Sequence, residues 1–491
     1  MSAPVSPATP ASPVASAPSA PNAATRPEDR VPVPSKVAYG AANMVGLFNG
    51  NLTKELINPV YVIALGLSPA LVGVAMMIFR LYDAFTDPIM GWISDNTRTR
   101  WGRRRPWMLL GCILCAFSLY LMWMVDRDWS TGLQTAWLIG AGIVLYTCST
   151  IWGVPYESLG LELTPDYKER TSVSSYKMII SSAAGLLIGW AWTITQLPMF
   201  RDPVTGAPDT LAGARGLAIL AGALIILFGT LSVVVTRERF YHAAKSQEKV
   251  TLKGNFAATL RSRPFLALVF VALCAVTATG LVNGIGFFVR LYHVCGGDTV
   301  LAAKITGYQA TFWLPISIVA VFLFQAIGGR WSKTHALIVA MVFTTVAAVS
   351  QWWLFRPDLP YLSLVPSFLL AFGTTGMWQM LPSMNADVVD DDELHTHARR
   401  EGAFAAIFSW FMKLSFTVGV GLPGVIVTWA GFAVANGKSQ LPGVITSMRL
   451  WHIGLPLGLL LVSLILLLSY PLSVGRMTQI RRELEARRGN L

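Results

Sequence analysis

The sequence predicts an all-α membrane protein with twelve transmembrane helices, and three observations support this prediction. Of the 491 residues, 54% are hydrophobic and only 13% are charged, whereas about 25% of residues in a soluble domain are charged. Twelve apolar stretches are each long enough to cross a hydrocarbon core of roughly 30 Å, which takes about 20 helical residues. The charged residues gather mostly in the connections between these stretches.

Residues 1–35 precede the first apolar stretch and are expected to form a disordered cytoplasmic tail. They consist largely of Pro, Ala and Ser, with few large apolar residues. Such a composition cannot bury enough apolar surface to fold. Because the segment has no apolar core region, it does not have the pattern of a signal peptide.

The twelve helices follow in chain order from the apolar stretches. We expect them at residues 36–66, 70–94, 107–125, 134–163, 172–197, 213–236, 264–294, 302–328, 335–354, 361–388, 401–432 and 449–472. The longest connection, a cytoplasmic middle loop at 237–263, divides them into six-helix bundles at 36–236 and 264–472. Two such halves are typical of the major facilitator fold. A basic cytoplasmic tail, 473–491, ends the sequence.

The charges of the connections alternate along the chain. The connections after helices II, IV, VI and VIII and the C-terminal tail are rich in Arg and Lys, whereas those on the other side hold few. Because cytoplasmic loops carry the excess of basic residues, both termini are expected in the cytoplasm. We expect a monomeric integral protein of the plasma membrane, which is the inner membrane in a bacterium.

Three other classes of protein are excluded by the pattern. The net charge of +12 does not indicate nucleic-acid binding, because the charges lie in short loops rather than on one soluble face. Cys112 and Cys115 have metal-ligand spacing, but they lie mid-membrane without a second pair, so we expect buried apolar side chains. No nucleophile–base set or phosphate loop indicates an enzyme, and no cofactor is expected. His395 and His397 are expected to be solvated in a cytoplasmic loop.

Helix II carries the pair of acids that indicates function. Asp83 and Asp87 are four residues apart, so on a helix they share one face. A carboxylate at bilayer depth costs about 2.5–3.5 kcal/mol on the insertion scale, and two on one face repel each other. Such a pair either shares a proton or encloses a cation. The sequence therefore indicates a cation-coupled transporter, with sodium or a proton as the coupling ion.

Other polar residues within the helices have two interpretations each. In helix I, Lys54 and Glu55 either extend to the outer interface or face a cavity. We expect Asn51 to face the cavity, as a candidate for binding substrate. In helix IV, Thr150 either supplies a hydroxyl ligand to a sodium site or bonds its own helix backbone. Glu157 is a lone acid inside the same helix and a candidate for binding substrate or a proton.

Two lysines and a tryptophan complete the candidates. Lys177 opens helix V, and Lys413 lies within helix XI, where a lysine either pairs with an acid or binds substrate. The acids of helix II are the expected partners of Lys413. Trp378 lies in helix X, and its simplest interpretation is that it packs at the membrane interface.

Three blocks of sequence resemble the glycoside–pentoside–hexuronide:cation symporter family of the melibiose-permease type. The first runs from Lys36 to Trp107 and contains KVAYG, RLYDAFTDPIMGW and TRTRWGRRRPW. The second contains VPY followed by LTPDYKERTS, and the third contains ADVVDDDELHTHARREGAF followed by Lys413. The blocks lie in both halves, so the resemblance covers nearly the whole chain after the tail.

The resemblance implies a sodium, lithium or proton symporter of the major facilitator fold. Asp83 and Asp87 match the acidic cation ligands of the family, and Thr150 matches its hydroxyl ligand. Thr86 stands where some members have an asparagine, so sodium and proton coupling both stay open. Trp378 and Lys413 match residues of the sugar cavity and its link to the ion site. Lys177 lies at or next to a position where the family often has arginine.

The sugar site departs from the family more than the ion site does. Leu47 and Gly153 stand where the melibiose carrier has sugar-binding aspartates, and Glu157 stands where it has a tryptophan. Melibiose is therefore not carried over as the substrate, and Glu157 becomes a candidate acceptor for the hydroxyls of a different glycoside. Symport of an amphipathic lipid such as a lysophospholipid is the alternative.

The basic loop after helix II is a candidate gate. Arg98, Arg103 and Arg104 are expected to pair with acids at the cytoplasmic helix ends and to hold that side closed in the outward-facing state. The expected partners are Glu162, Asp387 and Asp390. A role in setting membrane topology is compatible with this one.

Overall fold

The structure is a computed structural model. It describes residues 29–164, 166–236, 238, 259–396, 400–437 and 439–488. Within these ranges the secondary structure is helical, apart from two isolated β-bridges between single residues. The N-terminal tail up to residue 28 and most of the predicted middle loop lie outside the described residues.

The helices of the first half begin with one that alternates between two helix types. It consists of α1 (Val33–Gly46), the π-helix η2 (Leu47–Leu52), α2 (Thr53–Ile57) and the π-helix η3 (Asn58–Ala64). The others are α3 (Pro69–Asn96), α4 (Arg105–Leu121), α5 (Thr131–Glu162), α6 (Tyr167–Gly189), α7 (Ala191–Thr195), the 3-10 turn η4 (Pro198–Phe200) and α8 (Thr210–Val235).

The helices of the second half begin with α10 (Arg263–Val289), which continues into the π-helix η6 (Arg290–Val294). They continue as α11 (Thr299–Arg330), α12 (Lys333–Leu354), the 3-10 turn η7 (Pro360–Ser363), α13 (Leu364–Thr396), α14 (Glu401–Trp429), the 3-10 turn η8 (Val434–Asn436), α15 (Pro442–Leu468) and α16 (Val474–Arg488). Each of the twelve predicted apolar stretches corresponds to one of the long helical segments.

Among the described residues, nine helices are long and apolar enough to cross a membrane. The other three predicted spans differ for physical reasons. α4 has only 17 residues, and α6 is polar over its first turns. The helix from Val33 to Ala64 is interrupted by π turns. Pro59 lies at the start of η3 and removes a backbone donor there, which favours the irregular turn.

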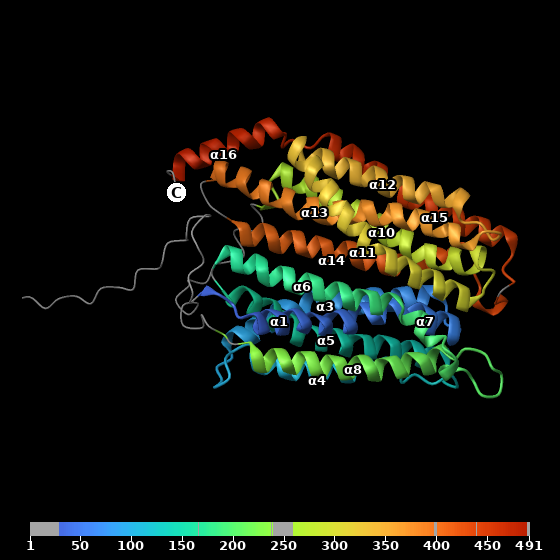
Figure 1. Ribbon diagram of the computed structural model, residues 1–491. Coiled ribbons are helices and arrows are strands. Elements are labelled where there is room, and N and C mark those ends of the chain that lie inside the picture. Colours follow the sequence, from blue (N-terminus) through green and yellow to red (C-terminus); the bar gives the residue numbers. More distant parts are fainter. Residues whose placement is uncertain are drawn as a thin grey trace, which may run out of the picture.

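Figure 1 shows the helices in two groups, with α1 and α3 to α8 in one and α10 to α15 in the other. The end of the bundle where α1 begins and α16 lies is called the terminal end below. α3 and α14 pack together across the two groups. A methyl group on Gly73 of α3 would lie 2.2 Å from the carbonyl oxygen of Gly421 in α14. Glycine therefore lets the two backbones touch.

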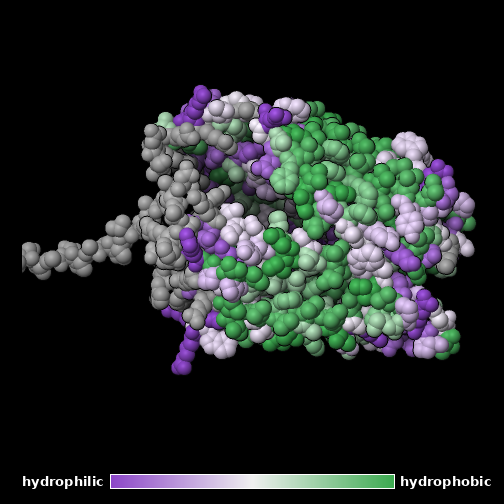
Figure 2. All heavy atoms as spheres, viewed as in Figure 1, coloured by the Kyte–Doolittle hydropathy of each residue, from purple (hydrophilic) through white to green (hydrophobic). Residues whose placement is uncertain are grey.

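The two groups are joined most tightly at the end opposite the terminal end. There Trp190 Nε1 donates to Thr311 Oγ1 (2.9 Å), and Thr193 Oγ1 donates to the carbonyl oxygen of Ala303 (2.8 Å). One apolar core runs through the first group and continues into this end of the second group, through residues such as Phe288 and Ile426. Figure 2 shows a broad apolar band across the visible face of the molecule and a hollow between the groups nearer the terminal end.

Three segments differ from the sequence prediction. α1 begins at Val33, and Val31 is buried with its backbone N–H donated to Glu169 Oε2 (3.0 Å), so residues 29–35 are not a disordered tail. α13 continues to Thr396, which places His395 in its last turn rather than in a loop; His397 lies outside the described residues. The predicted C-terminal tail contains α16, whose Ile480 and Leu484 are buried in the core of the second group.

Candidate cation site and central cavity

Four side chains from three helices meet at the pair of acids on α3. Thr150 Oγ1 of α5 lies 3.1 Å from Asp83 Oδ1 and 3.1 Å from Asp87 Oδ1, as the donor to either carboxylate. Lys413 Nζ of α14 lies 3.1 Å from Asp83 Oδ2 and 2.5 Å from Asp87 Oδ2. The one-turn spacing of the two acids on α3 turns both toward the same point, as expected for positions i and i+4.

Thr86 lies beside this cluster rather than at its centre. Its Oγ1 donates to the backbone carbonyl of Asp83 (3.1 Å) and lies 3.2 Å from Thr150 Oγ1. The cluster therefore offers two carboxylates and two hydroxyls, which are the hard oxygen ligands that sodium favours over nitrogen or sulfur. The two acids and Lys413 sum to one negative charge, so the set has the charge needed to hold one monovalent cation.

A cavity of about 530 Å³ opens on the acid pair. Its wall includes Glu157 of α5 and Arg80 of α3. Arg80 Nη1 donates to the hydroxyl of Tyr146 (2.9 Å), and its guanidinium lies 5.7 Å from the ring centres of Tyr146 and Phe416. Arg80 is thus held by aromatic rings and is turned away from an ion pair with Asp83.

A second cavity of about 560 Å³ lies between the two halves, farther from the terminal end. Asn51 lines both cavities, so the two are neighbours that share one wall. Residues of both halves line the second cavity, hereafter the central cavity. Its polar wall consists of Asn51, Glu55, Ser181, Ser182, Asn283, Arg290, Thr306, Gln309, Ser317, Gln351 and Ser367.

Three of the predicted substrate residues line one cavity: Asn51, Glu157 and Lys413 all border the space at the acid pair, and Asn51 also lines the central cavity. Lys177 forms an ion pair with Glu157 (2.6 Å) on the side of the terminal end. Trp378 stacks on Phe416 with ring centres 5.5 Å apart and lines a small apolar cavity of about 280 Å³.

The sequence left Glu55 undecided and passed over Arg290 and Gln309, although all three line the central cavity. The available signal was an arginine within a long apolar stretch, since charged residues in a membrane span usually face a cavity. The structure assigns Glu55 to the cavity wall rather than to the outer interface.

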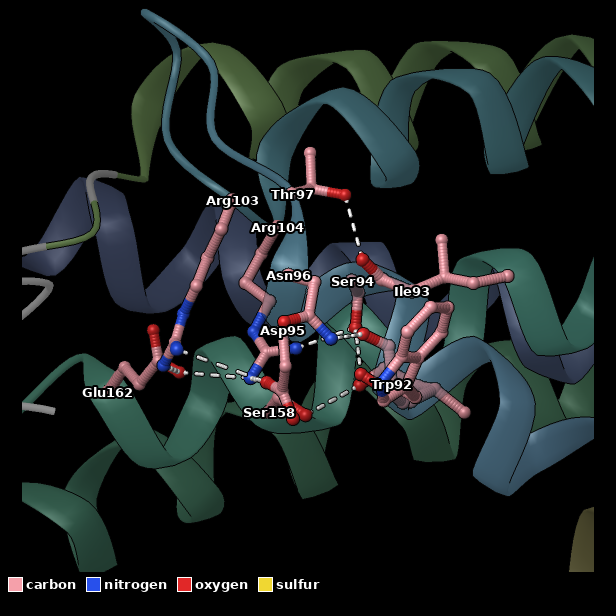
Figure 3. A network of polar contacts seen from close by, with 12 residues as sticks. Trp92, Ile93, Ser94, Asp95, Asn96, Thr97, Arg103, Arg104, Ser158 and Glu162 are labelled. Atoms are coloured by element: carbon pink, nitrogen blue, oxygen red, sulfur yellow. Dashed lines mark hydrogen bonds and ion pairs between the residues drawn. The ribbon is translucent and has the colours of Figure 1, made fainter. Parts of the chain in front are cut away.

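The basic loop after α3 forms ion pairs within its own half (Figure 3). Arg103 Nη2 lies 2.5 Å from Glu162 Oε1, and Arg104 pairs with Asp95 and lies 3.4 Å from the same Glu162 oxygen. Figure 3 shows both arginine side chains directed toward Glu162 on α5. The predicted pairing with Glu162 is thus present, while Arg98 is exposed.

The predicted pairing of these arginines with Asp387 is not present in this conformation. Asp387 of α13 pairs instead with Lys333 (2.7 Å), at the start of α12 in its own half. Among the residues that the structure describes, no ion pair joins Arg98, Arg103 or Arg104 to an acid of the second half. Pairs across the halves, with Asp387 or Asp390, stay a prediction for the outward-facing state.

Glu238 is a further residue that the sequence did not single out. Its carboxylate accepts from the backbone N–H groups of Arg103 (3.0 Å), Arg104 (2.8 Å) and Arg105 (3.2 Å). These are the free donors at the beginning of α4, where an anion is favoured. Gly102, with φ +105°, leaves room for the carboxylate, which a Cβ there would meet at 2.4 Å.

Comparisons with known proteins agree with this architecture. Residues 38–474 match the family model described as MFS/sugar transport protein. The chain is 24% identical to the glucuronide carrier protein homolog of Escherichia coli, over 92% of this chain and 95% of that protein. It is 23% identical to the isoprimeverose transporter of Lactiplantibacillus pentosus, over 90% and 89%. It is 25% identical to the sodium-dependent lysophosphatidylcholine symporter 1 of Gallus gallus, over 85% and 83%.

Two solved structures show the same fold. A bacterial homologue of the lysosomal transporter Spinster, in an inward-facing conformation, matches with a TM-score of 0.57 at 13% identity, over 94% of this chain and 99% of that one. A D-xylose–proton symporter matches with a TM-score of 0.55 at 16% identity, over 87% and 96%. The family match spans most of the chain, and the relatives are transporters rather than enzymes. The chain therefore belongs to the MFS/sugar transport protein family and is a cation-coupled symporter with the major facilitator fold.

Proposed function

We propose that the protein couples the entry of a sodium ion to the uptake of a sugar or glycoside across the plasma membrane, with both termini in the cytoplasm. The observation that carries this proposal is the cluster of Asp83, Asp87 and Thr150 around Lys413 Nζ. It lies beside a cavity that shares Asn51 with the central cavity. An ion site and a substrate cavity with a common wall are what coupling requires.

Lys413 acts as a built-in cation in this proposal. Its ammonium group lies where an ion between the two carboxylates would lie, and two positive charges do not share that position. Sodium therefore displaces Lys413, which is then free to turn toward the cavities. The movement links the ion site on α3 to α14 of the other half. A reciprocal gain in affinity of about 1–3 kcal/mol is typical of such coupling.

Sodium is preferred here over a proton because of the hydroxyls. Protonation needs only a carboxylate, whereas Thr150 and Thr86 add oxygen atoms beside both acids. Proton-coupled symport is the alternative mechanism that the experiment must distinguish from sodium-coupled symport. Asp83, Asp87, Thr150 and Thr86 are the proposed cation-binding residues, with Glu157 and Lys177 near the cytoplasmic exit.

Alternating access follows from the two halves. With the termini in the cytoplasm, the hollow at the terminal end makes this conformation inward-facing. The glycine contact between α3 and α14 lies at the opposite, external end, where the halves would separate to admit substrate. Rigid-body rocking of the two six-helix bundles around the central cavity exchanges the two states.

Uptake into proteoliposomes tests the proposal. Labelled glycosides are offered with an inward sodium gradient or with a proton gradient alone. Sodium-driven accumulation supports the proposal, and accumulation driven only by the proton gradient replaces sodium with a proton. Asp83→Cys should abolish accumulation while leaving some exchange, and full active uptake by this variant would remove Asp83 from the ion site.

A lysophospholipid is the second candidate substrate. It is favoured by the similarity to the lysophosphatidylcholine symporter of Gallus gallus and by the small apolar cavity at Trp378. Competition in the same vesicles separates the two. If lysophosphatidylcholine is accumulated with sodium and glycosides are not, the lipid is the substrate.

A further inference from the structure

The wall of the central cavity carries two opposite charges that are not joined to each other. Glu55 comes from α2 in the first half and Arg290 from η6 in the second half, and both line the cavity. No ion pair connects them, and among the described residues no hydrogen bond reaches the Glu55 carboxylate. Both groups therefore border a space that a ligand can occupy.

Arg290 is held in place by neighbours that use only part of its guanidinium. Nη1 donates to Gln309 Oε1 (2.6 Å), and the Gln309 amide nitrogen donates in turn to Ser367 Oγ. A guanidinium has five N–H donors. Nε of Arg290 is buried with no partner in the described structure. The relay fixes the orientation of Arg290 and leaves donors for a ligand.

Both charged residues lie next to irregular helix turns. Glu55 is in the short α2 between the π-helices η2 and η3, and Arg290 is the first residue of the π-helix η6. π turns are rare and occur often at functional sites. Two such distortions facing one cavity from opposite halves are a second, independent indication that a ligand binds here.

The chemistry of the pair selects the ligand. Inside a membrane, an acid without a hydrogen-bond partner and an arginine with unused donors are both costly. Sugar hydroxyls donate to Glu55 and accept from Arg290, so one sugar ring satisfies both groups. Among the groups that line the cavity, the charges of Glu55 and Arg290 cancel, and Lys54, the neighbour of Glu55 in the sequence, is not one of them. A substrate with its own carboxylate would be repelled by Glu55. Trp313 in the same wall offers an aromatic face to the apolar side of a sugar ring.

We infer that the substrate is an uncharged glycoside that bridges Glu55 and Arg290, with Gln309 as a positioning residue for Arg290. This inference rests on the proposed sugar symport and assigns it a site away from Glu157, Lys177 and Trp378. Because the ligand contacts one charged residue in each half, its binding also ties the two halves together.

The test measures the binding of neutral glycosides and of the matching uronic acids to the purified protein in the presence of sodium. Calorimetry and thermal unfolding are the two readouts. Glu55→Gln and Arg290→Gln should each weaken the best neutral glycoside about 10- to 100-fold, the range expected for lost hydrogen bonds to a charged group. Sodium-induced stabilisation should persist in both variants. Glu55→Gln should also bind the uronic acid about fivefold or more tighter than the parent does, since Arg290 is then unopposed.

Matched controls use the same substitutions outside the cavity. Glu483→Gln on α16, at a partly buried position, and Arg356→Gln, at an exposed one, should bind the glycoside like the parent. Glu55→Asp keeps the negative charge on a shorter side chain and should give an intermediate loss of glycoside affinity. This variant replaces Glu55→Gln if Glu55→Gln fails to fold. Parental glycoside affinity in both cavity variants overturns the inference and leaves sugar symport standing. A parent protein that binds no glycoside, with or without sodium, overturns the proposed sugar function itself.

Discussion

Lys413 Nζ lies 2.5 Å from Asp87 Oδ2, and this ion pair joins α14 of the second half to α3 of the first. Lys413 also pairs with Asp83 at 3.1 Å. The three side chains are 22–37% exposed to the cavity, so water screens the pair in part and the coupling ion has access to it. In the proposed function, the arrangement of the two halves would therefore depend on whether Lys413 or a coupling ion occupies the space between the acids.

Lys413→Met tests the role of the lysine as a built-in cation. Without the ammonium, the two acids repel each other, so the variant should unfold at a lower temperature than the parent in potassium. Sodium should restore most of the loss and should bind roughly tenfold tighter, because no internal cation competes with it. Thermal unfolding as a function of sodium concentration measures both effects. Weaker sodium binding in the variant would show that Lys413 supports the ion rather than competing with it.

Thr150→Val should weaken sodium binding about tenfold, which corresponds to about 1.4 kcal/mol, since one hydroxyl contact to the ion site is lost. The control is Thr147→Val in the same helix. Thr147 bonds the backbone of Ile143 and the hydroxyl of Tyr82 rather than the acids. Sodium-dependent calorimetry distinguishes the two, and equal losses in both variants would argue for a general disturbance of α5.

Arg104→Lys should destabilise the folded protein. Only 5% of Arg104 is exposed, and its guanidinium contacts Ser94, Asp95 and Glu162 together. A lysine ammonium cannot reproduce this planar fork. Because Asp95 is 55% exposed, we discount the range for buried pairs and expect a loss of about 1–3 kcal/mol.

The energetic coupling between Arg104 and Glu162 is measured in a double-mutant cycle of Arg104→Lys and Glu162→Gln. Thermal unfolding gives the stability of each variant in the cycle. Arg98→Lys in the exposed part of the same loop is the matched control and should change stability little. Additive effects of Arg104 and Glu162 would mean that the two residues act independently.

Gly73→Ala should impair transport while leaving sodium binding intact. The added methyl group would meet the backbone oxygen of Gly421 at 2.2 Å, and a backbone atom cannot move aside as a side chain can. Overpacking of this kind typically costs about 1–3 kcal/mol, and here it forces apart the external contact of α3 and α14.

Gly140→Ala is the control for this prediction, because nothing lies within 4 Å of the added methyl group. Uptake and sodium-induced stabilisation are measured side by side. Normal uptake by Gly73→Ala would show that the close contact is not needed for the transport cycle.

Local pattern was enough to predict the helices and the acid pair. The lengths of the apolar stretches gave the spans, and the four-residue spacing of Asp83 and Asp87 placed both acids on one face. Lys413 was assigned to these acids because an isolated lysine in a membrane needs a partner. The structure has this contact, and the part of these residues in transport stays a prediction.

The rest depended on tertiary packing that no local pattern contains. Glu55 and Arg290 are 235 positions apart in sequence, and only the folding of both halves places them on one cavity. The helix at 361–388 was predicted to end within the acidic run, and His395 was expected in a cytoplasmic loop. In the structure, Asp387 and Asp392 pair with Lys333 and Arg400, which compensates the charge and lets the helix continue.

The π turns of the first helix have a consequence for insertions and deletions. Each residue advances an α-helix by about 100°, so the wider turn at η2 sets the angular phase of everything that follows it. Deleting Gly50, whose Cβ position faces open space, would restore ordinary α-helical winding. The orientation of Glu55 about the helix axis would then change little, because a π turn takes up one extra residue within a helix, while Glu55 would move along the axis by about 1.5 Å. An insertion elsewhere in helix I, with no such turn to take it up, would instead rotate Glu55 by about 100° away from the cavity.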